Sequence, residues 1–471
     1  MAEPAAPREL ARDLGVSHAS AIVVGTIIGS GIFIVPRTMM AAVGSTQMVY
    51  LAWIVGGLLS FFGALTYAEL GAMKPAAGGE YVYIRDAYGP LPAFLYGWTW
   101  FLVAKPASVA SVTTGLAEAL AGLPRFAFLA SDALAYPLHV TWGQLFAIAA
   151  TLLITGINYI GVRKAGDFQL VFTVLKIAMI LAIAIIAFTW VGGSWGNFHS
   201  SYGGAHGGLT GFMMALIAAL WAYDGWNDLN MVAGEVRRPE RSIPIALIAG
   251  VAIVAALYIL MNVAIQYVLP AGLIATAKSP AELATRQVLG PVGAAVVTLG
   301  IVLSMLVTLN GTIMSGGRIP FAMSRDGYFF HALAGVHPKF RTPAPALIVQ
   351  AVLSVLLLLA AASFQQLLTL AIFAEWLFYM VATSTVFVLR RTEPDAPRAY
   401  KTWGYPVVPF LFIVAAAVLL VYSFRENAPY SYWGAGVIAA GAPVFWFFAW
   451  RKKAIGGSSR PGDDGRPSDQ S

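Results

Sequence analysis

The chain has no cysteine among its 471 residues, and only 11% of those residues are charged. The absence of cysteine excludes disulfides, thiolate metal sites and cysteine nucleophiles. A soluble domain has about 25% charged residues, so the low charge and a hydrophobic fraction of 59% exclude that class. A nucleotide-binding loop of the form G-x-x-x-x-G-K-[ST] is also missing, which argues against ATP as the energy source. We expect no cofactor.

Long apolar runs make up most of the chain. About twenty apolar residues cross a hydrocarbon core of roughly 30 Å as a helix. Twelve segments have this length, namely 17–42, 48–73, 90–121, 139–160, 167–191, 209–235, 242–269, 292–320, 343–362, 366–389, 406–424 and 430–450. We therefore predict an all-α polytopic membrane domain over 17–451, preceded by a tail at 1–16 and followed by a disordered tail at 452–471.

Positive charge indicates how the chain is oriented. If the twelve spans alternate, most of the 29 lysines and arginines fall on one side of the membrane. Cytoplasmic loops carry this excess, so we predict cytoplasmic termini in a multi-pass protein of the cell inner or plasma membrane. The same bias accounts for the net charge of +7 without a nucleic-acid partner.

Two of the apolar segments are interrupted. The interruptions lie at residues 25–33 (GTIIGSGIF) and 221–226 (WAYDGW). Because a bilayer offers no water to backbone groups, a broken helix is tolerated only where it is buried or lines a cavity. Paired breaks in matching halves indicate a transporter's substrate site. The spacing of Gly25 and Gly29 is also typical of simple helix packing, but the second break favours a site.

The exposed backbone at the two breaks suits a zwitterion. The N–H groups of Ser30, Gly31 and Ile32 would begin a half-helix, whose positive end suits a carboxylate. The carbonyl groups expected to accept an ammonium group are those of Ile27, Ile28, Trp221, Ala222 and Tyr223. Glycines such as Gly29 and Gly225 let a ligand approach the backbone closely.

Ionisable residues inside the spans are further candidates, because such residues are costly in a membrane. Lys176 lies about ten residues into its span, or roughly 15 Å deep, although a lysine can also snorkel to an interface. Lys105 precedes Pro106, and we favour a structural role for it. Asp224 lies in the second break, where it either binds substrate or a proton or caps a helix end. Asp228 we interpret as structural.

Three more residues complete the predicted site. Glu375 either binds a proton or forms a structural salt bridge, whereas Ser108 and Asn227 are possible pocket residues. A cluster of charges follows the second break, at Glu235, Arg237, Arg238 and Arg241. We interpret this cluster as a solvated charge run rather than an inner gate.

The order of the motifs along the chain resembles the amino acid–polyamine–organocation superfamily, and within it bacterial members of the L-type amino-acid transporter family. The resemblance covers about residues 17–424. The motifs that carry it are 25–36 (GTIIGSGIFIVP), 68–71 (AELG), 78–83 (GGEYVY), 88–94 (YGPLPAF), 105–106 (KP), 222–227 (AYDGWN), 229–230 (LN), 234–244 (GEVRRPERSIP), 309–311 (LNG), 324–327 (SRDG), 376–379 (WLFY) and 398–401 (RAYK).

This resemblance implies an inverted repeat of five plus five helices, as in the LeuT-like fold, with the first and sixth helices broken. The repeats would cover about 17–191 and 209–390, and two extra helices about 406–450. The resemblance also implies alternating access, with the substrate carboxylate at Ser30 and Gly31.

The resemblance further implies that the substrate amine meets carbonyl groups near Ile27 and Trp221, and that Trp221 acts as a gate. Lys176 would replace a sodium ion by bridging the first and eighth helices. Animal members pair with a heavy chain through a cysteine in the loop after the third helix. The loop at 122–138 has none, so we expect no disulfide-linked partner.

The leading hypothesis is a sodium-independent transporter of L-amino acids that exchanges one amino acid for another. A proton-coupled symporter of amino acids or amines is the alternative, and a non-transporting nutrient receptor is a third reading. We do not expect an enzyme, because Asp224 and Glu375 are the only candidate acid pair. Nor do we expect a metal site, because none of the six histidines has metal-binding spacing.

Overall fold

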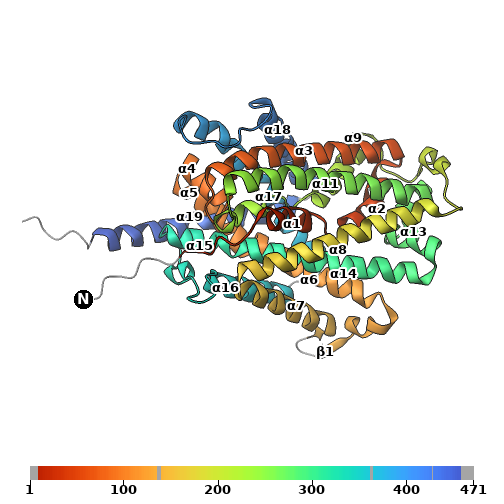
Figure 1. Ribbon diagram of the computed structural model, residues 1–471, viewed down its shortest axis with the longest axis horizontal. Helices are drawn as coiled ribbons and strands as arrows, with labels where there is room; N and C mark the ends of the chain where they lie inside the picture. Colours follow the sequence, from red (N-terminus) through yellow and green to blue (C-terminus); the bar gives the residue numbers. More distant parts are fainter. Residues whose placement is uncertain (1–8, 135–138, 361–363, 427, 458–471) are drawn as a thin grey trace, which may run out of the picture.

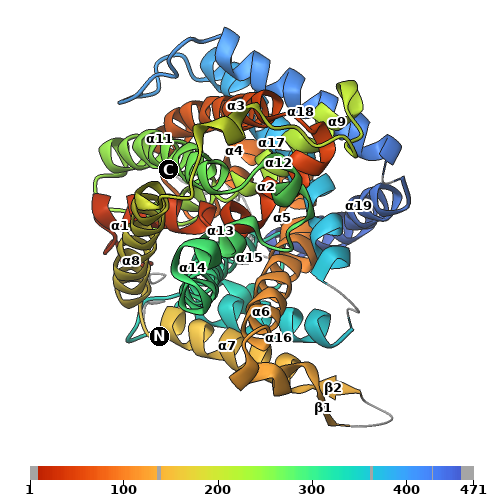
Figure 2. The ribbon, with the colours of Figure 1, turned by 90° about the vertical axis from the view of Figure 1, so that its right-hand side faces the viewer.

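The computed structural model describes residues 9–134, 139–360, 364–426 and 428–457, and these residues are helical almost throughout. Most of the long helices run side by side along the long axis of the molecule (Figure 1). The helices α4 and α15 and the end of α19 lie toward the left-hand end of that view. Figure 2 looks along the bundle and shows the helices packed around one another.

Except for one short helix between 48–73 and 90–121, the helices of the first half follow the expected segments. They are α1 (Val16–Ile27), α2 (Gly31–Val43), α3 (Thr46–Met73), α4 (Glu80–Tyr88), α5 (Pro90–Thr99), α6 (Lys105–Ala121), α7 (Trp142–Tyr159) and α8 (Val162–Thr189). Local rules set several ends. The side chains of Ser45 and Thr141 accept hydrogen bonds from the first turns of α3 and α7, as N-caps do.

The second half adds helices between the expected spans as well as within them. They are α9 (Gly208–Ala222), α10 (Asp228–Met231), α11 (Pro239–Val268), α12 (Ala271–Thr276), α13 (Pro280–Leu289), α14 (Pro291–Gly316), α15 (Arg318–Arg325), α16 (Ala344–Ala360), α17 (Phe364–Thr392), α18 (Val407–Glu426) and α19 (Ala428–Gly457). The expected tail at 452–471 starts within α19, which continues to Gly457. Residues 458–471 lie outside the described residues, as do residues 1–8 of the N-terminal tail.

Two short features were not anticipated from the sequence. A π-helical turn at Trp100–Ala104 separates α5 from α6, directly before Lys105 and Pro106. Proline has no N–H to donate to the preceding turn, and single π turns of this kind are frequent at functional sites. In the loop after α6, β1 (Asp132–Leu134) pairs antiparallel with β2 (Val140–Thr141).

The helices are long and apolar enough for a membrane. Within the described residues, seven helical segments meet that requirement by length and composition, and three shorter apolar helices accompany them. One of the shorter helices is α9, because this helix ends at Ala222, at the second break. The protein is thus a helical polytopic membrane protein.

Side chains are distributed as a membrane requires. Large apolar residues such as Ile54, Leu153 and Val174 are exposed on the outer faces of their helices. Ionisable residues such as Lys105, Lys176 and Asp228 are buried inside the bundle. The broken helix formed by α1 and α2 is central, because α1 packs on α8, α11 and α14.

Candidate functional site

The first break leaves the start of a helix without internal partners. The segment α1 ends at Ile27 and α2 begins at Gly31. The first hydrogen bond of α2 runs from the Phe33 N–H to the Ser30 carbonyl oxygen, at 3.1 Å. The N–H groups of Ser30, Gly31 and Ile32 therefore lie at the positive end of the half-helix.

The glycines of the first break have different surroundings. A Cβ at Gly25 would lie 2.3 Å from Thr173 Oγ1, so Gly25 serves close helix packing. A Cβ at Gly29 would approach nothing closer than Thr308 Oγ1, at 3.7 Å. At Gly31 a Cβ would meet Ala222 Cβ at 3.1 Å, which brings the two breaks into contact. The packing interpretation of the glycine pair thus holds for Gly25 but not for Gly29.

The second break is a turn between α9 and α10. Gly225 has a φ of 105°, a conformation open mainly to glycine. A Cβ there would also lie 2.9 Å from the Thr26 side chain of α1. The sequence therefore places glycine where the second break crosses the first.

A cavity lies between the two breaks. Its volume of about 110 Å³ exceeds the roughly 10–15 Å³ that a single water requires, so it has room for a small solute. Its lining comes from α1, α2, α6, α9, α10, α14, α17 and the two breaks. The lining residues are Thr26, Ile27, Gly29, Ser30, Gly31, Lys105, Ser108, Ser111, Val112, Trp221, Ala222, Asp224, Gly225, Asp228, Met305, Thr308, Thr312 and Glu375.

Most of the predicted site residues line this cavity, and five do not. The five are Ile28, Ile32, Tyr223, Asn227 and Lys176. Tyr223 is buried against Trp53, with ring centroids 5.7 Å apart. Asn227 donates a hydrogen bond of 2.6 Å to Glu80 Oε1. Sequence reasoning did not assign Thr26, Met305, Thr308 or Thr312 to the site.

Lys176 lies behind the first break. Its ammonium group donates to the carbonyl oxygens of Gly25 at 2.9 Å, Ile28 at 2.6 Å and Ser304 at 3.3 Å. The side chain is fully buried, so snorkelling to an interface is wrong for this lysine. The ammonium joins the C-terminal end of α1 to α14, where the helix dipole is negative.

Several carbonyl groups expected to receive a substrate amine already have donors. The Tyr258 hydroxyl donates to the Ile27 oxygen at 3.0 Å and to the Ala222 oxygen at 2.7 Å. The Ile28 oxygen accepts from Lys176 and from Ser304 Oγ, the latter at 2.6 Å. A carbonyl oxygen has two lone pairs. The Ile27 oxygen also accepts from the Gly29 N–H at 2.8 Å, so of these two oxygens the one of Ala222 retains capacity. Ile28 is not among the residues that line the cavity.

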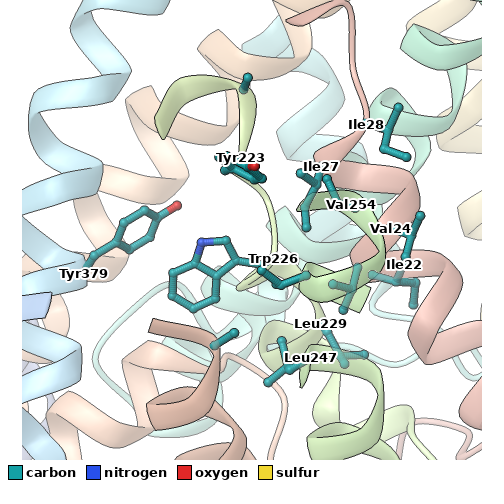
Figure 3. Packing of buried hydrophobic residues seen from close by; sticks show 14 of the residues in the cluster. Ile22, Val24, Ile27, Ile28, Tyr223, Trp226, Leu229, Leu247, Val254 and Tyr379 are labelled. Carbon is teal, nitrogen blue, oxygen red and sulfur yellow. The ribbon is translucent and has the colours of Figure 1, made fainter. Parts of the chain in front are cut away.

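The opposite wall of the cavity is acidic. Lys105 forms a buried ion pair with Asp228, which supports the structural interpretation of both residues, although both also line the cavity. The Tyr379 hydroxyl donates to Asp224 Oδ1 at 2.8 Å and to Asn227 Oδ1 at 3.2 Å. Figure 3 shows Tyr379 next to Trp226 at the second break.

Asp224 and Glu375 stay without a cationic partner. No salt bridge to either carboxylate occurs among the described residues. Lys105, the lysine that lines the cavity, forms its ion pair with Asp228 instead. No group of three or more metal-ligating residues occurs in the described part of the chain. The wall therefore carries more negative than positive side chains, which suits a positively charged group in the cavity.

The interpretation of the charge run after the second break as solvated is wrong for Glu235, although Arg237, Arg238 and Arg241 are exposed. Glu235 is fully buried and forms a two-point ion pair with Arg318, with distances of 2.7 Å and 3.0 Å. Arg318 lies 83 positions away in the chain, so the charge run itself gave no sign of this partner. Arg237, in contrast, is half-exposed and pairs with Asp13 at 2.9 Å.

A family model described as amino acid permease matches residues 14–448. This chain belongs to the amino acid permease family. The b(0,+)-type amino acid transporter 1 of Mus musculus is 32% identical over 451 residues, covering 94% of this chain and 90% of the relative.

Other relatives of this permease come from bacteria and humans. The serine/threonine exchanger SteT of Bacillus subtilis is 32% identical, covering 87% of this chain and 91% of the relative. The human cystine/glutamate transporter is 31% identical, covering 94% and 87%. The permease is therefore a transporter and not an enzyme, and its sequence has no cysteine for a disulfide to a partner.

Proposed function

We propose that this permease exchanges one L-amino acid for another by alternating access, without sodium. The observation that carries the proposal is the cavity between two broken helices, lined by α2 N–H groups on one side and carboxylates on the other. A carboxylate and an ammonium group in one ligand match these two ends of the cavity.

The substrate backbone would lie along the first break. Its carboxylate would accept hydrogen bonds from the N–H groups of Ser30 and Gly31, at the positive end of α2. Its amine would use the free lone pair of the Ala222 oxygen and would lie close to the carbonyl groups of Ile27 and Trp221. Trp221, which is partly exposed on the cavity wall, would close over the bound substrate.

The substrate side chain would point toward Asp224, Glu375 and Ser108. Because Lys105 neutralises only Asp228, this end of the site favours a side chain that is positively charged. A carboxylate inside the bundle without a cationic partner is unfavourable, so a cationic side chain would gain from meeting Asp224 and Glu375.

Lys176 supports the proposal that sodium is not required. Its ammonium occupies a position surrounded by carbonyl oxygens of α1, the first break and α14. A fixed positive charge at this point would hold the broken helix in the way that a bound cation otherwise could.

We also propose that the fold has twelve spans and two inverted repeats, at about 17–191 and 209–390. Helices that would correspond in the two repeats pack on each other, as α3 does on α11, α6 on α14 and α7 on α16. The halves of the broken helices do so too, because α2 packs on α9 and α1 on α10. Both termini would lie in the cytoplasm, according to the distribution of lysine and arginine.

Proton symport is the second candidate, and Glu375 is the observation that favours it. This carboxylate faces the cavity beside Asp224 and Asp228. Three carboxylates next to one lysine repel one another. Binding of a proton would reduce this repulsion, as would binding of a cationic substrate.

Transport by the purified protein in liposomes tests both candidates. Uptake of labelled serine, lysine and glutamate is measured in sodium-free buffer, with liposomes that are empty or preloaded with unlabelled amino acid. Exchange predicts uptake only into preloaded liposomes, with lysine preferred. Uptake into empty liposomes that follows an imposed pH gradient would instead establish symport. No uptake of any amino acid would contradict the proposed function.

A further inference from the structure

Glu80 is a buried carboxylate that lies outside the cavity. It is the first residue of α4 and is fully buried. The two residues before it, Gly78 and Gly79, have φ values of 108° and 51°, which glycine adopts most readily. A Cβ at Gly79 would lie 2.8 Å from the Met231 nitrogen of α10. The turn therefore packs on the backbone of α10 and places Glu80 next to the second break.

A chain of side-chain hydrogen bonds connects Glu80 with the cavity. The amide nitrogen of Asn227 donates to Glu80 Oε1 at 2.6 Å. The Tyr379 hydroxyl donates to Asn227 Oδ1 at 3.2 Å and to Asp224 Oδ1 at 2.8 Å. Among these four residues, Asp224 is the one that lines the cavity. The chain thus runs from a residue outside the cavity to a carboxylate that faces the proposed substrate side chain.

Glu80 determines the direction of this chain. A carboxylate accepts hydrogen bonds, whereas a side-chain amide has a donor end and an acceptor end. Because Glu80 accepts from the amide nitrogen of Asn227, the amide oxygen faces Tyr379. The Tyr379 hydroxyl has a single proton, which it shares between the Asn227 oxygen and Asp224. Asp224 therefore receives less than a full hydrogen bond from Tyr379.

Charge balance does not explain the position of Glu80. Lys105, the lysine that lines the cavity, forms its ion pair with Asp228, and no salt bridge to Glu80 occurs among the described residues. The side-chain partner of Glu80 is instead the neutral amide of Asn227. A carboxylate buried in this way is costly, so stability alone does not account for it.

Resting on the proposed function, we propose that Glu80 is a positioning residue for substrate selectivity. It holds the Asn227 amide with its oxygen toward Tyr379, which keeps part of the Asp224 carboxylate available for a cationic substrate side chain. Without Glu80 the amide turns, and its NH2 group donates toward the Tyr379 hydroxyl oxygen. The Tyr379 proton then goes entirely to Asp224, which lowers the gain from a cationic side chain.

The test compares Glu80→Leu with Glu80→Gln in the liposome exchange assay. Leucine removes the acceptor, whereas glutamine keeps a carbonyl oxygen of the same reach and removes only the charge. We expect Glu80→Leu to lower lysine uptake relative to serine uptake about fivefold, which is the effect of about one hydrogen bond. Glu80→Gln should keep the ratio of the unmodified protein. A purely structural loss would lower both uptakes together and leave their ratio unchanged.

A double variant tests whether Asn227 transmits the effect. Asn227→Ala alone removes the acceptor that competes with Asp224 for the Tyr379 proton, so it should lower the ratio to a similar extent. Adding Glu80→Leu to Asn227→Ala should cause no further change, because residues of one hydrogen-bond chain do not act additively.

Asp86→Asn is the matched control. Asp86 is also an acidic residue of α4, but its carboxylate pairs with Lys74 at 3.3 Å and with Arg85 at 2.8 Å. It is not among the residues that line the cavity. We expect this variant to keep the ratio of lysine uptake to serine uptake, which separates the role of Glu80 from a displacement of α4.

The outcomes separate this inference from the proposed function. If the unmodified protein shows no exchange, the proposed function fails and this inference fails with it. If the protein exchanges amino acids without preferring lysine, or if Glu80→Leu keeps that preference, exchange stands and the role of Glu80 is contradicted. A lowered ratio in Glu80→Gln, or an unchanged ratio in Asn227→Ala, would contradict it as well, even if Glu80→Leu does not fold.

Discussion

Two lysines are buried in the described part of this bundle, and their positive charges are balanced in different ways. Lys176 is surrounded by the carbonyl oxygens of Gly25, Ile28 and Ser304, with no carboxylate among its described partners. Lys105 forms an ion pair with the Asp228 carboxylate. The charge of Lys176 is balanced mainly by backbone groups of a broken helix, which a substitution cannot remove. The charge of Lys105 is balanced by one side chain, which a substitution can remove.

This difference indicates what each lysine does. An ammonium held by backbone carbonyl groups depends on the shape of the first break, so we expect Lys176 to hold that shape during transport. An ammonium held by one carboxylate neutralises that carboxylate, so we expect Lys105 to determine how many carboxylates of the acidic wall remain for a substrate. We expect substitutions to separate these two roles.

The largest effect is expected for Lys176→Met. This change leaves the carbonyl groups of Gly25, Ile28 and Ser304 without their shared donor. Each hydrogen bond from a charged group contributes about 1.5–3 kcal/mol, so the loss of several should lower exchange by a factor of about 100 or more. Lys164→Met, on the same helix but exposed, is the control and should exchange normally. Normal exchange by Lys176→Met would show that the ammonium does not hold the break.

Lys105→Met should act on stability instead. Breaking a buried ion pair by removing one partner costs about 3–5 kcal/mol, which denaturation of the detergent-purified protein measures. The double variant Lys105→Met/Asp228→Asn removes both charges and should recover most of that loss. No corresponding partner exists for Lys176 among the described residues. A double variant as unstable as the single one would mean that the pair is not what stabilises this wall.

Asp224→Asn and Glu375→Gln should change selectivity more than stability. Each removes a carboxylate that lines the cavity without a cationic partner. Hydrogen bonds to charged groups contribute about 1.5–3 kcal/mol, so lysine uptake relative to serine uptake should fall roughly tenfold. Asp132→Asn, in the exposed strand β1, is the control. If the ratio of lysine uptake to serine uptake were unchanged in both site variants, the acidic wall would not contribute to substrate selectivity.

The smallest effect is expected for Arg237→Ala. The Arg237–Asp13 pair is exposed, with 55% and 39% of the two side chains accessible. Exposed pairs contribute about 0–1 kcal/mol, so stability and exchange should both stay close to those of the unmodified protein. A large loss in either measurement would mean that this pair belongs to an inner gate after all.

The sequence predicted the elements that follow from composition and local pattern. Apolar length predicted the helices, and the glycines with Asp224 predicted both breaks, because these features act within a few residues. The resemblance to a known family pointed to Lys176, and its contacts with α1 and α14 agree with the implied position. The roles of the individual site residues remain predictions.

Other features depended on partners far apart in the chain. Lys105 and Asp228 are 123 positions apart, and nothing near either residue indicates the other. The pairing of Glu235 with Arg318 could not be predicted from the sequence for the same reason, because the two residues are 83 positions apart. Tyr258 lies 231 positions from Ile27 and is one of two tyrosines in the apolar helix α11. Only Pro106 gave a local sign, since a proline inside a span predicts some irregularity before it.

The most direct test of the site is a side chain placed in the cavity at Gly29. The fold leaves space there, because a Cβ would meet nothing closer than 3.7 Å. A valine should therefore fold normally but fill the space of the substrate backbone. Gly156→Val, at an open position on α7, is the control.

The measurement is binding of labelled amino acid to purified Gly29→Val protein, compared with the control variant and the unmodified protein. Crowding of a packed site costs about 1–3 kcal/mol, so we predict affinity weakened by about 10- to 100-fold with unfolding unchanged. Unchanged affinity in a folded Gly29→Val protein would contradict the placement of the substrate between the two breaks.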